Sequence, residues 1–362
     1  MPTHPRAKRP RPPKESATPV TAPASPHAVR IFVALTRAGL PGADRLEPMA
    51  GDASTRAYVR VHLAGAPSLV AMVLPADTRR SDEGTAGAAP AEIPFVNVQR
   101  YLRAGGVPVP DIRAVDEEAG ILLLEDLGDD LLHGVAGDEP ARRPWYEKAV
   151  DEIVRLQTLG RERPDPSCIA FQRRFDERLL EWELEHFVVN TLVRRRDVEL
   201  PAPERAEVSR IFRLLAARLA SAPATLVHRD FQSRNLLRQG ERLRVIDFQD
   251  ALLGPAVYDL VALLRDSYVS LTPPEIDQLL ARYARATGAD GDALRASFDW
   301  QTVQRKLKDA GRFDFIDLVR KNPSFMQWQP RSLAYVKEAA ARHRELAPLV
   351  EIFGRWVPEL AA

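Results

Sequence analysis

The sequence predicts an α+β protein of two lobes, a small amino-terminal lobe rich in β-strands and a larger carboxy-terminal lobe that is mainly α-helical. The chain has 362 residues, 45% of them hydrophobic, which is enough for a sizeable core and too many for one ordinary compact domain. Apolar residues follow a mostly extended pattern from about residue 41 to 128 and helical spacing after it. We therefore divide the chain into a tail and two lobes.

Charge and composition exclude several classes of partner. The formal net charge is +1, from 51 basic and 50 acidic residues, so the chain has no broad positive field for wrapping nucleic acid or coating an anionic membrane. The one cysteine, Cys168, excludes an internal disulfide framework and a cysteine-based zinc cluster. No apolar run approaches the ~20 residues that span a bilayer. We expect a cytoplasmic protein without nucleic-acid or membrane partners, and the sequence leaves the oligomeric state open.

Residues 1–26 are predicted to form a disordered, basic, proline-rich tail. They contain eight prolines and five Lys or Arg residues, with hardly any apolar side chain. Because no apolar core region follows the basic residues, the segment does not predict a secretory signal. It also lacks the amphipathic stripe of a membrane anchor. We expect a solvated arm, since recruitment of nucleic acid by this tail has only composition in its support.

The amino-terminal lobe, residues 27–128, is predicted from short alternating patterns and the turn residues between them. Helical spacing predicts a first helix that ends at Gly39 and a second that starts at Pro94 and ends before Gly105. The polar stretch 76–91 predicts a loop. Two antiparallel strand pairs are expected, 58–61 with 69–74 and 112–115 with 120–124.

The carboxy-terminal lobe, residues 129–362, is predicted to be mainly helical, with one interruption. Helices are expected at about 143–159, 173–196 and 203–221, and several more after residue 256. The interruption consists of three apolar runs of strand length separated by polar turns, at 226–227, 236–237 and 245–246. Short strands inside a helical lobe often carry a site on their connecting loops.

Two motifs in this interruption carry the chemistry. The run His228-Arg229-Asp230-Phe231-Gln232-Ser233-Arg234-Asn235 matches a kinase catalytic loop, in which the Asp accepts the proton of the attacking hydroxyl and the Asn binds magnesium. Twelve residues after Asn235 comes Asp247-Phe248-Gln249 at a predicted strand end, where a second magnesium ligand belongs. Either motif alone is compatible with a helix cap or an Asx-turn. Together and in this order they predict phosphoryl transfer from a nucleotide with Mg²⁺.

The expected phosphate-binding elements of the amino-terminal lobe are irregular. Between the first two strands the chain has Gly51-Asp52-Ala53-Ser54-Thr55-Arg56, with one glycine. Backbone amides and the Ser54 and Thr55 hydroxyls could cradle a phosphate with Arg56 as countercharge, and an ordinary polar hairpin turn explains these residues equally well. The strand 69–74 has Met72 and Val73 where a kinase carries a lysine. Either arginine and magnesium handle the phosphate charge, or this lobe is degenerate.

A hinge for the nucleotide base is predicted between the lobes. The apolar strand 121–124 runs into Glu125, Asp126 and Leu127, where backbone groups would receive adenine. A buried strand followed by a turn is equally compatible with these residues, so the assignment depends on position. The choice of ATP over GTP is left open.

The chain resembles the aminoglycoside phosphotransferase family, whose protein-kinase-like fold acts on small-molecule hydroxyls. The resemblance is carried by the two motifs above, by Gly254-Pro255 and by Tyr258-Asp259-Leu260, and it covers most of residues 45–350. Within the family the chain is similar to the bacterial anomeric sugar kinases that phosphorylate N-acetylmuramate and N-acetylglucosamine at C1 in peptidoglycan recycling. That closer likeness is carried above all by the run 245–251 with 258–261 and Leu263-Leu264-Arg265-Asp266, and also by residues 51–54 before Arg56 and Tyr58 and by residues 122–128.

The resemblance implies a role for each candidate residue. Asp230 would be the base for the anomeric hydroxyl, and Asn235 and Asp247 would hold Mg²⁺. ATP would bind at residues 54–56 and 125–127 of the amino-terminal lobe. Gln232 and Arg265 are the candidates for the sugar. Asp259 is expected to stabilise the catalytic loop, and His228 to be a buried hydrogen-bonding residue, because no second histidine lies at metal-ligand spacing.

Two other functions stay open. Within the same fold, the acceptor could be an aminoglycoside or another small amino alcohol. From a different class, Met72 and the poor glycine loop suggest a nucleotide-binding pseudokinase or scaffold. The presence of Asp230, Asn235 and Asp247 argues against a pure binder, which would need neither base nor metal ligands.

Overall fold

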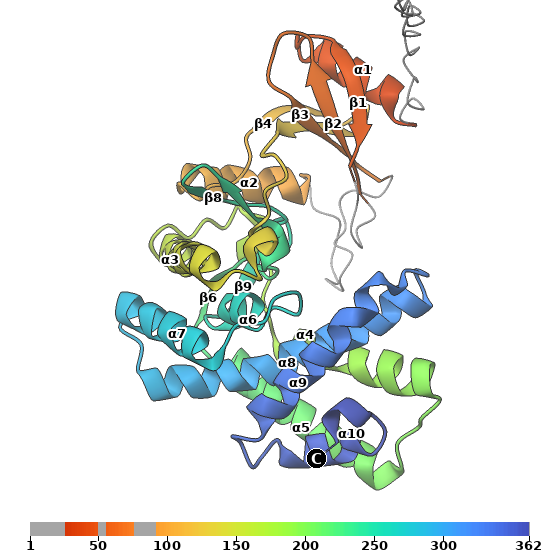
Figure 1. Cartoon of the computed structure of the whole chain (residues 1–362), viewed down its shortest axis with the longest axis vertical. Helices are drawn as coiled ribbons and strands as arrows, with labels where there is room; N and C mark the ends of the chain where they lie inside the picture. The colour runs from red at the N-terminus through yellow and green to blue at the C-terminus, as the bar shows by residue number, and fades with distance from the viewer. Residues whose placement is uncertain (1–25, 50–55, 76–91, 362) are drawn as a thin grey trace, which may run out of the picture.

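The computed structural model describes residues 26–49, 56–75 and 92–361 and shows two lobes. A sheet with one helix on its outer side forms the upper lobe in Figure 1, and helices make up most of the lower lobe. The predicted two-lobed α+β architecture is confirmed. Within the part of the chain that is described, no helix is both long and apolar enough to cross a membrane.

The upper lobe is built on a five-stranded antiparallel sheet of order β1-β2-β3-β5-β4. Its strands are β1 (Ala43–Pro48), β2 (Ala57–Leu63), β3 (Leu69–Val73), β4 (Ile112–Asp116) and β5 (Ile121–Glu125). Both predicted strand pairs are confirmed. A first strand before Gly51 was implied without bounds, and β1 fills that place; its residues show no alternation of apolar and polar side chains that would have located it.

The two faces of this sheet bury different neighbours. Val59, Ala71 and Leu123 lie in one cross-strand row and pack with Ile31 and Leu35 of helix α1 (Ala28–Arg37). The alternate row points to the other side. It contains Tyr58, Met72 and Leu122, which join the core shared with the lower lobe. Residues of this inner face would line a nucleotide site between the lobes.

Helix α2 (Pro94–Ala104) belongs to the lower lobe by packing, although it precedes β4 and β5 in the sequence. Phe95 lies with its ring centroid 4.7 Å from that of Phe248. The Tyr101 hydroxyl donates to the Leu159 carbonyl at 3.2 Å. Just after the helix, the Pro108 carbonyl accepts the Val245 amide at 3.0 Å. Figure 1 shows α2 beside β8 accordingly. Helix α2 therefore packs on residues of the lower lobe although it lies within the predicted amino-terminal segment 27–128.

The helices of the lower lobe follow the predicted order. They are α3 (Glu139–Glu162), α4 (Glu177–His186), α5 (Ala202–Ala220), α6 (Tyr258–Leu264), α7 (Pro273–Thr287), α8 (Gly291–Leu318), α9 (Gln329–Ala340) and α10 (Ala347–Gly354), with shorter turns at η1 (Leu132–Val135), η2 (Ile169–Phe171), η5 (Pro323–Trp328) and η6 (Pro358–Leu360). The helix expected at 173–196 begins at Glu177 and continues as a π-helix, η3 (Phe187–Arg194).

Helix α8 crosses the start of this π-helix at very short range. A Cβ added to Gly311 would lie 2.5 Å from the carbonyl carbon of His186 and 2.6 Å from the amide nitrogen of Phe187. Only a glycine allows the two backbones to approach this closely. The contact fixes the position of α8 relative to α4 and η3.

Two short ribbons interrupt the helices where strands were predicted. Strand β6 (Ala224–Val227) pairs with β9 (Leu252–Pro255), and β7 (Leu236–Gln239) pairs with β8 (Arg242–Val245), all antiparallel. Strand β9 was not predicted. The ribbons bring the loop between β6 and β7 next to the residues that follow β8.

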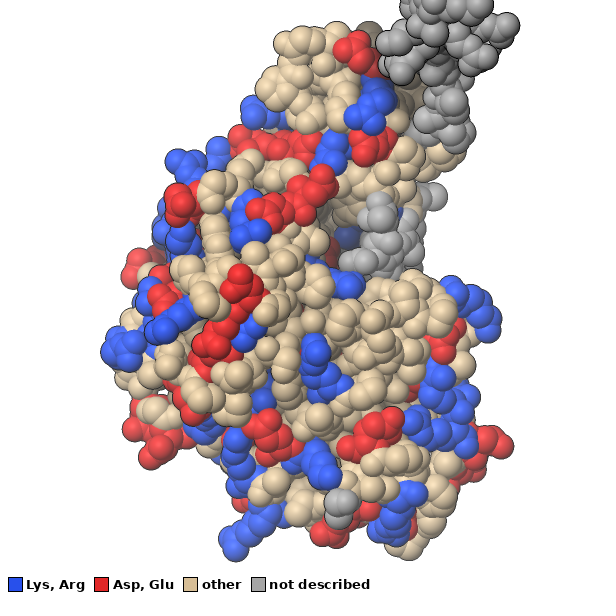
Figure 2. All heavy atoms as spheres, viewed as in Figure 1, with Lys and Arg blue, Asp and Glu red and all other residues tan. Residues whose placement is uncertain are grey.

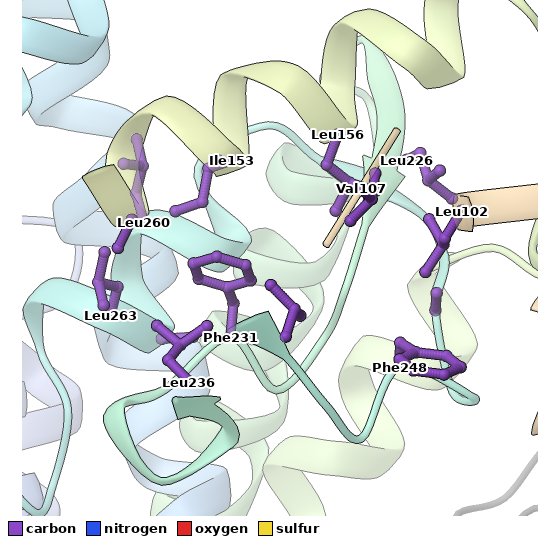
Figure 3. Close-up of a cluster of buried hydrophobic side chains, with 14 of the residues drawn as sticks. Leu102, Val107, Ile153, Leu156, Leu226, Phe231, Leu236, Phe248, Leu260 and Leu263 are labelled. Atoms are coloured by element: carbon purple, nitrogen blue, oxygen red, sulfur yellow. The ribbon is translucent and has the colours of Figure 1, made fainter. Parts of the chain in front are cut away.

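The apolar residues of the two motifs anchor these loops in the core. Figure 3 shows Phe231 beside Ile153 of α3 and Leu260 of α6, and Phe248 on the side of Leu102 of α2. Phe231 and Phe248 are 1% and 0% exposed. Each follows a predicted functional aspartate directly, so burial of the ring fixes where the preceding carboxylate lies.

Candidate active site

The structure brings Asp230, Asn235 and Asp247 together. Asn235 lies in η4 (Ser233–Asn235), and its side-chain amide donates to the Asp230 carbonyl at 2.9 Å and to Asp247 Oδ2 at 3.4 Å. The Ile246 amide donates to the Asn235 carbonyl at 3.0 Å, which holds the two motifs side by side. The three side chains that sequence reasoning selected for catalysis and metal binding are therefore neighbours.

The loop around Asp230 has a strained backbone that is held from outside. Arg229 has φ 81° and Asp247 has φ 65°, in the left-handed region that non-glycine residues rarely adopt. Asp259 at the start of α6 is fully buried, and its carboxylate accepts the His228 amide at 2.7 Å and the Arg229 amide at 3.0 Å. The predicted stabilising role of Asp259 is confirmed.

His228 connects the two motifs. Its Nε2 lies 3.0 Å from the Ile246 carbonyl, and its Nδ1 accepts the Asp230 amide at 3.3 Å. Burial lowers the pKa of His228, which favours a neutral ring with the proton on Nε2. The side chain is a buried hydrogen-bonding residue, as predicted.

Asp247 lies where negative charge accumulates. Burial, and then the charge of Asp230, raise its pKa to about 6. Gln249 donates to Asp247 Oδ1 at 2.9 Å. Oxygen ligands and an excess of negative charge are what Mg²⁺ requires, so the residues present fit this cation.

A further side chain at the site, Arg305 of α8, was missed by sequence reasoning. It donates through one guanidinium nitrogen to Asp230 Oδ1 at 3.0 Å and through the other to the Arg229 carbonyl at 2.6 Å. It lies 75 residues after Asp230 in a long helix. The one available signal was the charged run Arg305-Lys306-Leu307-Lys308-Asp309 within an otherwise amphipathic pattern, which identifies no partner.

The nucleotide side of the site contains Arg56 and Tyr58 near Asp247. The Arg56 charge acts to lower the pKa of Asp247. Burial of Tyr58, and then the Asp247 charge, raise the pKa of the Tyr58 hydroxyl to about 12. Tyr58 is paired across the sheet with Met72, which is fully buried. The predicted phosphate ligands Ser54 and Thr55 lie outside the described residues.

The predicted hinge residues hold the lobes together with their side chains. Glu125 forms an ion pair with Arg244 of β8 at 2.7 Å, and Asp126 forms one with Arg60 of β2 at 2.8 Å. Leu127 is buried. These contacts stiffen the connection, and a contact of residues 125–127 with adenine stays a prediction.

The two candidate sugar ligands occupy different surroundings. Gln232 belongs to the catalytic loop, where its backbone amide donates to the Asp230 carbonyl at 2.9 Å. Arg265 is buried at the end of α6, and its guanidinium donates two hydrogen bonds of 2.7 and 2.8 Å to Glu338 of α9. The structure thus places Gln232 beside the base and gives Arg265 a structural ion pair, and a sugar contact of either residue stays a prediction.

A two-lobed fold with this loop and this pair of candidate metal ligands defines a phosphotransferase that acts on a hydroxyl group. The chain belongs to the phosphotransferase enzyme family, whose sequence profile matches residues 45–300. Its relatives include the N-acetylmuramate/N-acetylglucosamine kinase of Pseudomonas aeruginosa, 36% identical over 89% of this chain and 91% of the relative. The kinase of the same name from Neisseria meningitidis is 33% identical over 84% of this chain and 90% of the relative.

Solved structures agree on the fold. The choline kinase LicA of Streptococcus pneumoniae has a TM-score of 0.59 at 14% identity and covers 88% of this chain and 99% of its own. The ADP-bound aminoglycoside phosphotransferase APH(2'')-Ib has a TM-score of 0.54 at 14% identity, with 82% and 94% covered. The kinase-like fold expected from the sequence is confirmed.

Proposed function

We propose that the protein is an ATP- and Mg²⁺-dependent sugar kinase that phosphorylates the anomeric C1 hydroxyl of N-acetylmuramate, N-acetylglucosamine or both, in peptidoglycan recycling in the cytoplasm. The observation that carries the reaction class is the convergence of Asp230, Asn235 and Asp247. The relatives named above support the choice of acceptor.

In this proposal the chain's own residues position the acceptor and manage its proton. The Asp230 carboxylate accepts the proton of the C1 hydroxyl as that oxygen attacks the γ-phosphorus and the bond to the β-phosphate oxygen breaks. An anomeric hydroxyl is more acidic than an ordinary alcohol, so an unactivated carboxylate suffices as base. Asn235 and Asp247 would hold Mg²⁺, which supplies charge neutralisation at the phosphates.

The same proposal assigns the nucleotide to the inner face of the sheet. Arg56 supplies the positive charge that kinases take from a lysine on the strand corresponding to β3, and Ser54 and Thr55 are candidate phosphate ligands. Residues 125–127 receive adenine through their backbone. Gln232 and Arg265 remain the candidates for contact with the sugar.

The test is phosphoryl transfer from Mg²⁺-ATP to N-acetylmuramate, N-acetylglucosamine, an aminoglycoside and choline, with phosphorus NMR to locate the new phosphate. A sugar 1-phosphate is the expected product, and Asp230→Asn should reduce its formation to a small residual rate while nucleotide binding persists. A product from the aminoglycoside or choline alone would refute the amino-sugar acceptor. Nucleotide binding without any product would favour the pseudokinase.

A further inference from the structure

The guanidinium of Arg305 spans two consecutive residues of the catalytic loop. One nitrogen bonds the Arg229 carbonyl at 2.6 Å, and the other bonds Asp230 Oδ1 at 3.0 Å. Because one rigid fork is bonded to the main chain and to the side chain, it restricts rotation of the Asp230 carboxylate relative to its own backbone. The fork engages Oδ1, so one of the two carboxylate oxygens is held at a fixed position.

Arg305 is itself held from several sides. Its side chain is 2% exposed, and its Nε lies 3.8 Å from Asp309 Oδ2 one turn further along α8. The guanidinium carbon lies 5.0 Å from the ring centroid of Tyr258, which is stacked on Phe175 at 4.4 Å. Burial alone would lower the pKa of Arg305, but the charges of Asp309 and Asp230 outweigh burial and raise it. The cation is therefore permanent and nearly immobile.

The strained residue beside the base depends on the same arrangement. The amide of Arg229 is bonded by Asp259 and its carbonyl by Arg305, while its guanidinium forms a buried ion pair with Glu183 of α4 at 3.0 Å. A residue at φ 81° persists only where its surroundings over-determine it. Helices α4, α6 and α8 thus converge on one residue, Arg229, and Arg305 is the contributor that also touches the base.

We propose that Arg305 is a positioning residue that acts through Asp230 and fixes the orientation of its carboxylate toward the acceptor hydroxyl. This inference depends on the proposed role of Asp230 as base, but not on which hydroxyl compound is the acceptor. An error of about 1 Å in the placement of a reacting group costs on the order of 10²-fold in rate. Loss of the fork should therefore lower kcat by about 10²-fold and change KM for either substrate little.

A double-mutant cycle tests whether Arg305 acts through Asp230. We expect Arg305→Gln to lower kcat by about 10²-fold with KM values within about threefold of wild type, and Arg305→Lys to recover part of the loss, because a lysine reaches one of the two oxygens. In an Asp230→Asn background, Arg305→Gln should lower the residual rate by less than about threefold. An equal loss in both backgrounds, or an unchanged kcat, would overturn the proposal.

Two further measurements keep the test decisive. Arg142→Gln removes another buried arginine fork, which binds Glu275 at 2.8 and 3.0 Å between α3 and α7, and should leave kcat unchanged. A crystal structure of Arg305→Gln, or of Arg305→Lys if the first variant does not fold, should show the Asp230 carboxylate rotated; an unrotated carboxylate refutes the inference. Wild-type assays alone decide the acceptor, and the cycle is run on whichever acceptor gives product, so the two proposals fail separately.

Discussion

Gly311→Ala should destabilise the protein, because it inserts a methyl group between two backbones. The added carbon would lie 2.5 Å from the carbonyl carbon and oxygen of His186, and ordinary contact begins near 3.4 Å, so α8 and η3 must separate by about 0.9 Å. Overpacking of this kind costs about 1–3 kcal/mol and is offset by the roughly 1 kcal/mol by which alanine exceeds glycine in helix propensity. Because the obstructing atoms are backbone, we expect the free energy of unfolding to fall by about 1–2 kcal/mol.

The assay is urea unfolding of Gly311→Ala beside a control on the same helix. Gly291 begins α8, and a Cβ added there meets nothing within 4 Å, so Gly291→Ala should leave the free energy of unfolding unchanged or slightly higher. Arg305 lies six residues before Gly311 on α8, so kcat should fall in Gly311→Ala as well. A Gly311→Ala variant as stable as wild type would refute the close approach of the two helices.

Three further predictions concern Asp247, Asp259 and the amino-terminal tail. The pKa of Asp247 is about 6 in the folded chain, above its usual 3.8, so the stability that its protonated form contributes is present below pH 3.8 and lost as the pH rises through 6. Asp247→Asn should therefore be more stable than wild type at pH 7.5 in EDTA, by about 1–2 kcal/mol after allowance for partial exposure of the side chain. At pH 3.5 the two proteins should be equally stable. Thermal unfolding at both pH values checks this. Asp259→Asn keeps one acceptor oxygen for two backbone amides, so the free energy of unfolding in urea should fall by about 2–4 kcal/mol, and kcat should fall too. A stability within about 0.5 kcal/mol of wild type would contradict the role of Asp259 in holding the loop. Deletion of residues 1–26 should leave kcat and both KM values unchanged in the phosphoryl-transfer assay, and a loss of rate would show that the tail is more than a solvated arm.

Much of the fold and the centre of the site could be predicted because their signals are local. The pairs β2–β3 and β4–β5 come from alternation within one short stretch and the turn that joins them. Asp230, Asn235 and Asp247 lie within 18 residues of one another, so their spacing alone indicated that they converge. The bulky rings of Phe231 and Phe248 make the same stretch recognisable as part of a core.

The features that were missed depend on partners distant in the chain. Strand β1 forms by backbone pairing at a sheet edge, which places little demand on its side chains. Strand β9 contains Gly254-Pro255, typical of a turn, and is a strand because β6 lies beside it. The charged run around Arg305 does not identify its partner, since its role depends on a loop 75 residues earlier. Sequence patterns record periodicity, and they do not record which surfaces meet.

The attachment of α2 to the lower lobe has a consequence for how the molecule moves. A hinge motion that opens or closes the space between the lobes would carry the sheet and α1 as one body. Helix α2 would stay behind, because Phe95 and Tyr101 hold it to the catalytic segment and α3. A pair of spectroscopic labels on α2 and α8 would then keep a constant separation when nucleotide binds, whereas a pair on β2 and α8 would report the swing. Helix α2 would thus stay fixed with the lower lobe, although it lies in the sequence between strands of the sheet that moves.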